Sequence, residues 1–226
     1  KVYCRSNTFK IFRFLKLMLN KENKFYELAI ESNSLLLGDF ILKSGKRSPY
    51  FFNVGSFFEG GYIGDLANLY TDFILENDLD FEIIFGPAYK GIPLAASIAS
   101  SLSSRKDSPV PFAFDRKEEK SHGEGGKIVG NLQNKKVLIV DDVLTAGTAL
   151  MQSAEIIIKQ GGIISDALVA LDREEKIDGI LAKEKIRKEI NIDVHSIAKI
   201  SQLVEFFDLN EQQNEANVIK QYLEDQ

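Results

Sequence analysis

Two adjacent carboxylates followed by small polar residues form the stretch best suited to chemistry. Asp141 and Asp142 come directly after the aliphatic residues 137–140, and the chain continues V-L-T-A-G-T-A through residues 143–149. Backbone N–H groups of small residues at the start of a helix can close around a phosphate. The carboxylates would repel that phosphate, but they can accept hydrogen bonds from hydroxyls or hold a divalent cation. The pattern predicts a site for a ligand with both a phosphate and a diol, such as a ribose phosphate.

The neighbouring residues indicate which elements position this site. Residues 137–140 have the length and side-chain types of a strand buried on both faces, and a helix is expected from Gly147 to about Gly161. The polar residues therefore fall at the carboxyl end of a parallel strand, where open α/β sheets bind their ligands.

Two other interpretations of this stretch compete with a ribose-phosphate site. A core strand with a merely polar end explains the aliphatic run but not the acids followed by T-A-G-T-A. The Walker-B strand of an ATPase also ends in acids, but the chain contains no G-x-x-x-x-G-K-[ST].

A second strand–loop–helix unit is expected over residues 82–102. Its loop is G-P-A-Y-K-G, residues 86–91, which is bounded by glycines and carries Tyr89 and Lys90. Such a loop suits a second anion, such as a diphosphate, and the alternative is a plain tight turn.

Three further segments carry candidate ligand contacts, each with a plainer alternative. Residues 39–54 indicate two short strands whose adjacent aromatics, Phe51 and Phe52, point to opposite faces and are either core or cover a planar ligand. Residues 115–127 contain no apolar side chain and indicate either a cationic lid or a solvated loop. Arg173 follows an expected strand over residues 163–171, where its planar fork suits a carboxylate unless it is only a surface charge.

Composition restricts the class of protein. The chain has 226 residues, is 44% hydrophobic, carries a net charge of −5 and contains one cysteine, Cys4. We expect a single domain in a reducing, cytoplasmic setting, without general nucleic-acid binding and without a membrane span. Its segments are an N-terminal extension or helix at 1–24, a helix at 24–37, a hairpin at 39–54, a mobile loop at 115–130 and a polar C-terminal tail or amphipathic helix at 210–226.

Five motifs in order carry a resemblance to a known family. They are LKSGKRSPYFFN, GPAYKG, FDRKEEKSHGEGG, VLIVDDVLTAGTA and LDREE. Together they resemble the orotate phosphoribosyltransferase family, one of the type I phosphoribosyltransferases, over about residues 25–207. The resemblance implies an α/β fold with a central parallel sheet flanked by helices and a small N-terminal hood. It also implies Mg²⁺-dependent transfer of the phosphoribosyl group of phosphoribosyl diphosphate (PRPP) to orotate, which gives orotidine monophosphate. Two positions depart from the bacterial pattern, because Asp115 and Ser121 stand where asparagine and aspartate are expected.

The resemblance also implies roles for individual residues. Orotate would be bound by Lys43, Phe51, Phe52, Thr145 and Arg173. PRPP would be bound by Lys43, Tyr89, Lys90, Arg116, Lys117, Lys120, His122, Asp141, Asp142, Val143, Leu144, Thr145, Ala146, Gly147, Thr148 and Ala149. The residues implied to be catalytic are Lys90, Lys120, His122, Asp141 and Asp142.

Partners follow from the same resemblance. We expect a homodimer in which lid residues act in the neighbouring subunit's site, and an association with orotidine monophosphate decarboxylase. Mg²⁺ would be held mainly by PRPP, near Asp141 and Asp142. The competing functions are a phosphoribosyltransferase for another base and a PRPP-binding regulator, and the regulator would need a nucleic-acid face that this acidic chain lacks.

Overall fold

A computed structural model of the chain describes residues 21–42, 45–120 and 126–225, with the backbone alone at residues 117–120 and 126. By their contacts these residues divide into two compact units. The first contains residues 21–60 and 198–225, and the second is Gly61–Ile197. Each unit is described below by itself.

The second unit is built on a six-stranded sheet of order β10-β7-β6-β3-β4-β5. Strands β7, β6, β3 and β4 pair in parallel, and β5 pairs with β4 antiparallel. The predicted α/β fold with a central parallel sheet is confirmed. The strands are β3 (Ile83–Gly86), β4 (Phe112–Lys120), β5 (Gly126–Val129), β6 (Lys136–Leu144), β7 (Ile163–Asp172) and β10 (Asp193–Lys199).

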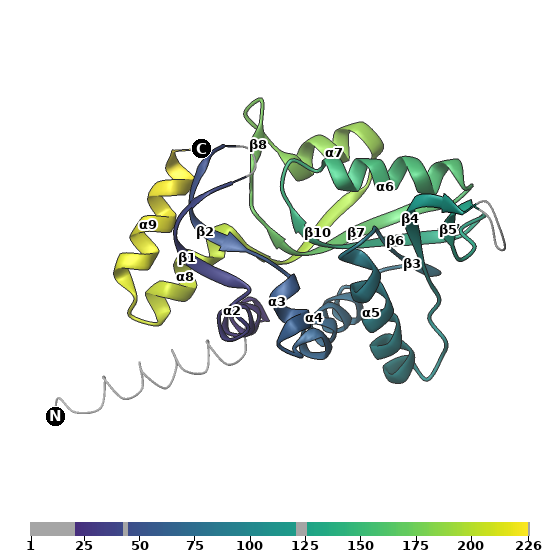
Figure 1. Cartoon of the computed structure of the whole chain (residues 1–226), viewed down its shortest axis with the longest axis horizontal. Helices are drawn as coiled ribbons and strands as arrows, with labels where there is room; N and C mark the ends of the chain where they lie inside the picture. Colours follow the sequence, from purple (N-terminus) through teal and green to yellow (C-terminus); the bar gives the residue numbers. More distant parts are fainter. Residues whose placement is uncertain (1–20, 43–44, 121–125, 226) are drawn as a thin grey trace. The chain divides into compact units, whose positions relative to one another are not determined.

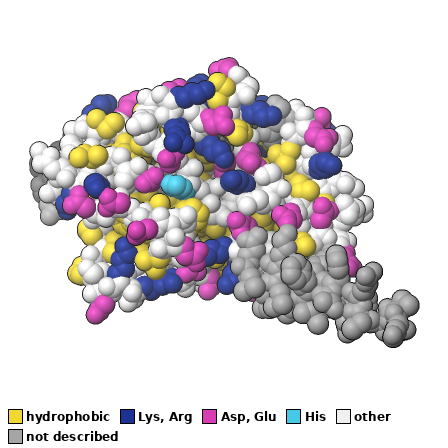
Figure 2. Space-filling view, turned by 180° about the vertical axis from the view of Figure 1, so that it is seen from behind, with side chains coloured by type: hydrophobic (Ala, Val, Ile, Leu, Met, Phe, Trp, Pro, Cys, Tyr) yellow, Lys and Arg dark blue, Asp and Glu magenta, His cyan; other side chains and the backbone are white. Residues whose placement is uncertain are grey.

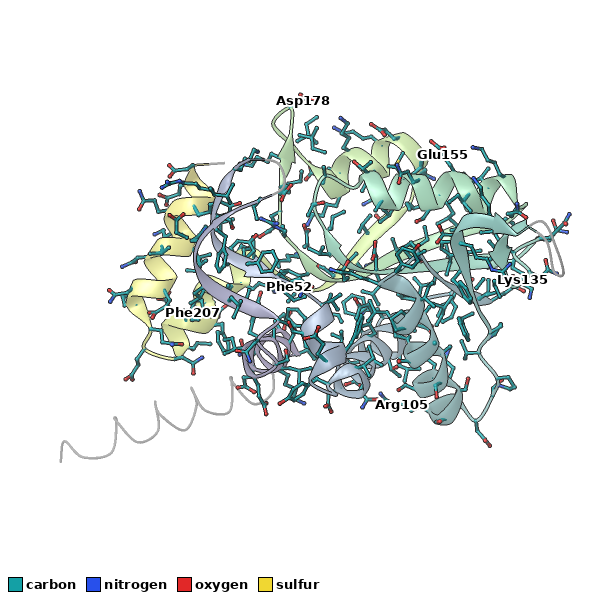
Figure 3. All side chains as sticks on the ribbon, viewed as in Figure 1. Phe52, Arg105, Lys135, Glu155, Asp178 and Phe207 are labelled. Carbon is teal, nitrogen blue, oxygen red and sulfur yellow. The ribbon has the colours of Figure 1, made fainter. Side chains whose placement is uncertain are left out.

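Helices cover both faces of this sheet (Figure 1). Helices α4 (Ile63–Glu76) and α5 (Gly91–Lys106) lie on one face, and α6 (Thr148–Lys159) and α7 (Ala182–Ile190) lie on the other. Figure 3 shows the labelled side chains of Arg105 on α5 and Glu155 on α6 at opposite outer sides, with the sheet between them. A short hairpin, β8 (Lys176–Ile177) and β9 (Ile180–Leu181), precedes α7.

The core of the second unit follows from the aliphatic run of β6. Val137, Leu138, Ile139 and Val140 are all at most 1% exposed, because helices bury both faces of the strand. Helix α4 packs through residues spaced by one turn, Leu66, Tyr70 and Ile74. Among the described residues drawn in Figure 2, acidic and basic side chains are intermixed.

The first unit combines a hairpin with helices around an aromatic core. It comprises α2 (Lys21–Glu31), β1 (Leu35–Ile41), β2 (Arg47–Phe52), α3 (Gly55–Glu59), α8 (Ile200–Leu209) and α9 (Gln213–Glu224). The ring of Phe25 lies 5.9 Å from that of Phe52 and 6.4 Å from that of Phe57, measured between centroids. The hydroxyl of Tyr26 donates to the main-chain oxygen of Lys199, which ties α2 to the start of α8. The antiparallel pairing of β1 with β2 confirms the predicted hairpin.

The structure differs from the sequence prediction in two segments. The helix expected over residues 24–37 ends at Glu31, since Asn33 takes a positive φ of 55° and Leu35–Leu37 pair with Phe52–Tyr50 in the hairpin. The loop expected over residues 115–130 is largely a pair of strands, because β4 continues to Lys120 and β5 pairs with it. Ladder hydrogen bonds satisfy the backbone there even though the side chains are polar. The C-terminal residues form the amphipathic helix α9, which buries Ala216 and Ile219.

In the part of the chain that the structure describes, no helix is long and apolar enough to cross a bilayer. The single-domain expectation and the extension at 1–24 stay predictions, and residues 1–20 lie outside the described part.

Ile139→Ala should lower the free energy of unfolding by about 2–5 kcal/mol, because it opens a cavity at the centre of β6. Ile139 is 1% exposed, whereas Ile158 on α6 is 57% exposed and serves as a matched control. Ile158→Ala should change the free energy of unfolding by less than about 0.5 kcal/mol. Urea denaturation of both variants measures the difference, and equal losses would contradict this account of the core.

Candidate active site

The two predicted carboxylates lie where β6 extends beyond one of its neighbours. Pairing of β6 with β3 ends at Ile139, whereas pairing with β7 continues to Leu144. Asp141 and Asp142 are therefore strand residues with only one neighbouring strand beside them. Asp142 is 8% exposed and Asp141 is half-buried. The loop that follows β3 is next to this unpaired edge of β6.

Lys90 offsets the charge of the pair. Its Nζ lies 3.3 Å from Oδ2 of Asp142, and the N–H of Asp142 donates to Oδ1 of Asp141 over 2.9 Å. Burial, followed by repulsion from Asp142, raises the pKa of Asp141 to about 7. Asp141 can therefore change charge near neutral pH, when a hydroxyl or a cation approaches.

Tyr70 supports the pair from the helix side of the sheet. Its hydroxyl donates to the main-chain oxygen of Asp141 over 2.6 Å, and its side chain is fully buried. Burial, and then the charges of Asp142 and Asp141, raise the pKa of this phenol well above its usual range. Tyr70 was not predicted from the sequence. The available signal was a tyrosine on the apolar stripe of α4, because a buried hydroxyl requires a hydrogen-bond partner.

The predicted phosphate turn joins β6 to α6. Gly147 caps the helix with φ of 77°, and a Cβ at this position would lie 2.6 Å from Cδ1 of Ile186. A glycine thus satisfies both the backbone conformation and the close approach of α7. A small cavity of about 20 Å³ opens at this turn and is lined by Asp141, Val143, Leu144, Thr145, Gly147, Ala149, Leu150 and Val169. Ala146 is exposed on the same turn, and Thr148 is the first residue of the helix.

The loop Gly86–Gly91 packs tightly at its two ends. A Cβ on Gly86 would lie 2.1 Å from the main-chain oxygen of Gly91, so the sequence must have glycine there. Between them the side chain of Tyr89 is 65% exposed, while Lys90 reaches Asp142. The peptide bond between Ala88 and Tyr89 is cis. The N–H of Ala88 donates to Oδ1 of Asp115 over 2.6 Å.

Arg173 lies at the same sheet edge as the carboxylates, as predicted. Leu144 pairs with Asp172, and the N–H of Arg173 donates to the main-chain oxygen of Leu144 over 3.1 Å. Arg173 is 9% exposed, and its Nε lies 3.3 Å from Oε1 of Glu175. The carboxylate of Asp172 lies 3.8 Å from Nζ of Lys183. Glu175 and Lys183 were not anticipated, because a charged stretch without an apolar pattern gives no signal of which charges meet.

The remaining predicted residues are placed as follows. Phe51 and Phe52 belong to the first unit and face opposite sides of β2, since Phe51 packs with Phe40 and Phe52 with Phe25. Arg116 lies on β4, half-buried. Lys117 and Lys120 are on the same strand, where the backbone alone is described. Lys43 and His122 lie outside the described residues.

A metal ion would find few protein ligands here. Among the described residues, no three His, Cys, Asp or Glu side chains gather in a way that could hold one. Asp141 and Asp142 are hard oxygen donors of the kind that Mg²⁺ accepts, and they could supply at most one or two ligands.

The raised pKa of Asp141 predicts a pH dependence of stability. Between about pH 4 and pH 7 the native state holds a proton that the unfolded chain has lost, so Asp141 contributes less stability as pH rises. Asp141→Asn removes this titration. Its stability relative to the wild type should rise by a few kcal/mol from pH 5 to pH 7, at about 1.4 kcal/mol per pKa unit, and then stay constant. Urea denaturation at pH 5, 6, 7 and 8 measures this difference, and a constant difference across that range would contradict the assignment.

The chain is similar to several known proteins in sequence and in fold. A family model described as "Phosphoribosyl transferase domain" matches residues 63–202. The chain is 49% identical to an orotate phosphoribosyltransferase of Marinobacter nauticus, covering 85% of this chain and 91% of that one. It is 43% identical to the one of Kluyveromyces lactis, covering 89% and 93%. Its fold matches the crystal structure of the Francisella tularensis orotate phosphoribosyltransferase with a TM-score of 0.79 and 38% identity, over 89% of this chain and 98% of that one. The chain therefore belongs to the orotate phosphoribosyltransferase family.

Proposed function

We propose that this enzyme transfers the phosphoribosyl group of PRPP to orotate, giving orotidine monophosphate and diphosphate in pyrimidine biosynthesis. One observation carries the proposal: Asp141 and Asp142 lie among the last four residues of β6, shortly before the turn that starts α6, and Nζ of Lys90 lies 3.3 Å from Oδ2 of Asp142. Acceptors for a diol, amides for a phosphate and a cation for a leaving diphosphate thus adjoin one another.

The donor substrate occupies the end of β6 and its neighbouring loops. Asp141 and Asp142 accept hydrogen bonds from the ribose hydroxyls, and residues 143–149 enclose the 5-phosphate at the positive end of α6. Tyr89 and Lys90 face the diphosphate. Further proposed PRPP-binding residues are Lys43, Arg116, Lys117, Lys120 and His122.

The acceptor is recognised by its carboxylate and its flat ring. Arg173 pairs with the orotate carboxylate, Thr145 hydrogen-bonds the ring, and Lys43, Phe51 and Phe52 are further proposed orotate-binding residues. Arg173 has the buried, partly oriented guanidinium that such a pairing needs, because Glu175 fixes its Nε side.

The reaction breaks the bond between the anomeric carbon of the ribose and the diphosphate oxygen as the orotate nitrogen forms a new bond to that carbon. Positive charge develops on the ribose and negative charge on the diphosphate. The chain's contribution is therefore to orient two substrates and to stabilise these charges, with carboxylates near the ribose and Lys90 near the diphosphate.

Mg²⁺ would be bound at this site mainly by oxygens of PRPP. When bound, it neutralises part of the diphosphate charge. Asp141 and Asp142 are the protein groups that would lie near it, and they could supply at most one or two ligands beside the oxygens of PRPP.

We also propose a homodimer in which residues of the predicted lid, 115–127, act in the neighbouring subunit's site, and an association with orotidine monophosphate decarboxylase. A cytoplasmic location rests on the single cysteine of the sequence.

Acceptor specificity tests the function. With PRPP and Mg²⁺ present, orotate should be consumed, which is measured as a loss of its absorbance. Hypoxanthine and uracil should react far more slowly, because they lack the carboxylate that is proposed to pair with Arg173. Consumption of another base with orotate inert would contradict the proposed acceptor.

Sharing of sites between subunits has its own test. Arg173→Ala should lose roughly 2–4 kcal/mol of transition-state stabilisation, the scale of one buried charged partner. Lys120→Ala should also be nearly inactive. If Lys120 acts across the dimer, mixing the two inactive variants should restore part of the activity, since mixed dimers hold one intact site. Mixtures that stay as inactive as the separate variants would refute the shared site.

A further inference from the structure

The loop Gly86–Gly91, proposed above to face the diphosphate and called the diphosphate loop below, is held by a side chain from the neighbouring strand. Parallel pairing of β3 with β4 ends at Gly86 and Phe114. The next loop residue is Pro87, which has no N–H, and after it the N–H of Ala88 donates to Oδ1 of Asp115 over 2.6 Å. The carboxylate of Asp115 thus continues the connection between the strands, one residue beyond the last ladder pair.

The same loop is held on its other side by β6. Nζ of Lys90 lies 3.3 Å from Oδ2 of Asp142, so both strands that flank β3 contact the loop through a carboxylate. The close packing of Gly86 on Gly91 fixes the loop's two ends. The position of Tyr89 and Lys90 therefore depends on where Ala88 is anchored.

We propose that Asp115 is a positioning residue that holds the diphosphate loop in its PRPP-binding conformation through the N–H of Ala88. This inference rests on the proposed function. A second carboxylate near a diphosphate is electrostatically unfavourable, so the useful property of Asp115 is its acceptor oxygen and not its charge. Asparagine, which has the same oxygen without the charge, should replace it.

The sheet provides a matched control. At the opposite end of β3, Oε2 of Glu82 accepts the N–H of Lys136 over 2.8 Å, which is the same kind of bond between neighbouring strands. Glu82 lies at the amino ends of the strands, away from the proposed PRPP site.

The test is calorimetric titration of PRPP with Mg²⁺ and no orotate into full-length wild type, Asp115→Ala, Asp115→Asn, Asp115→Glu and Glu82→Ala. Asp115→Ala should weaken PRPP binding roughly tenfold, the scale of one charge-assisted hydrogen bond. Asp115→Asn should bind within about threefold of the wild type, and Glu82→Ala should be unchanged. Asp115→Glu keeps the charge but moves the oxygen, so it should weaken binding even if Asp115→Ala does not fold. The KM for orotate should change less than the KM for PRPP in the Asp115 variants.

Three results would overturn the inference. The first is that Asp115→Ala or Asp115→Glu binds PRPP as tightly as the wild type does. The second is that Asp115→Asn weakens PRPP binding as much as Asp115→Glu does, and the third is that Glu82→Ala weakens it as much as Asp115→Ala does. If the wild type binds PRPP and consumes no orotate, the proposed acceptor is refuted. The PRPP titrations of the variants still decide the role of Asp115, because they contain no orotate. A wild type that binds no PRPP would overturn both.

Discussion

Two carboxylates side by side at the end of a buried strand repel each other, and the surrounding structure compensates for that repulsion. Asp142 faces Nζ of Lys90 at 3.3 Å, while burial and the charge of Asp142 raise the pKa of Asp141 to about 7. Beneath them Tyr70 holds the main chain of Asp141. A ligand that donates hydroxyl hydrogen bonds to Asp141, or brings a cation close to it, stabilises the ionised form of this carboxylate.

The proposed site brings one strand end and two loops to one edge of the sheet. In it the end of β6 would supply acceptors, the turn before α6 would supply amides, and the loop after β3 would supply Lys90. The register of β6 with β7 places Arg173 at this edge too, because Leu144 and Asp172 are paired. An enzyme that needs no covalent nucleophile can rely on such fixed charges and dipoles, provided that the loops carrying them stay in place.

The sequence was most informative where side-chain type and backbone requirement agree. The buried strand at residues 137–140, the glycine-bounded loop 86–91, the turn at Gly147 and helix α5 are all near their predicted positions. It was least informative where long-range pairing decides the structure. Leu35–Leu37 fit a helical pattern and are a strand because the hairpin partner is present.

The structure of the charged segments was also not predicted from the sequence. The strand β4 continues through polar residues because β5 pairs with its backbone, and α7 was missed although Ala182 and Ile186 are one turn apart and both buried. Tyr70 and Asp115 could not be assigned from sequence, since their significance lies in a main-chain group brought to them by the fold.

The most direct test of this account is the number of protons released when PRPP binds. Calorimetric titration with Mg²⁺ at pH 7, repeated in buffers of different ionisation enthalpy, gives that number for the wild type and for Asp141→Asn. If PRPP hydroxyls bind ionised Asp141, the wild type should release roughly half a proton more per site than the variant, because a group with a pKa near 7 is about half protonated beforehand. Equal proton release by the two proteins would contradict the assignment of Asp141 to the ribose.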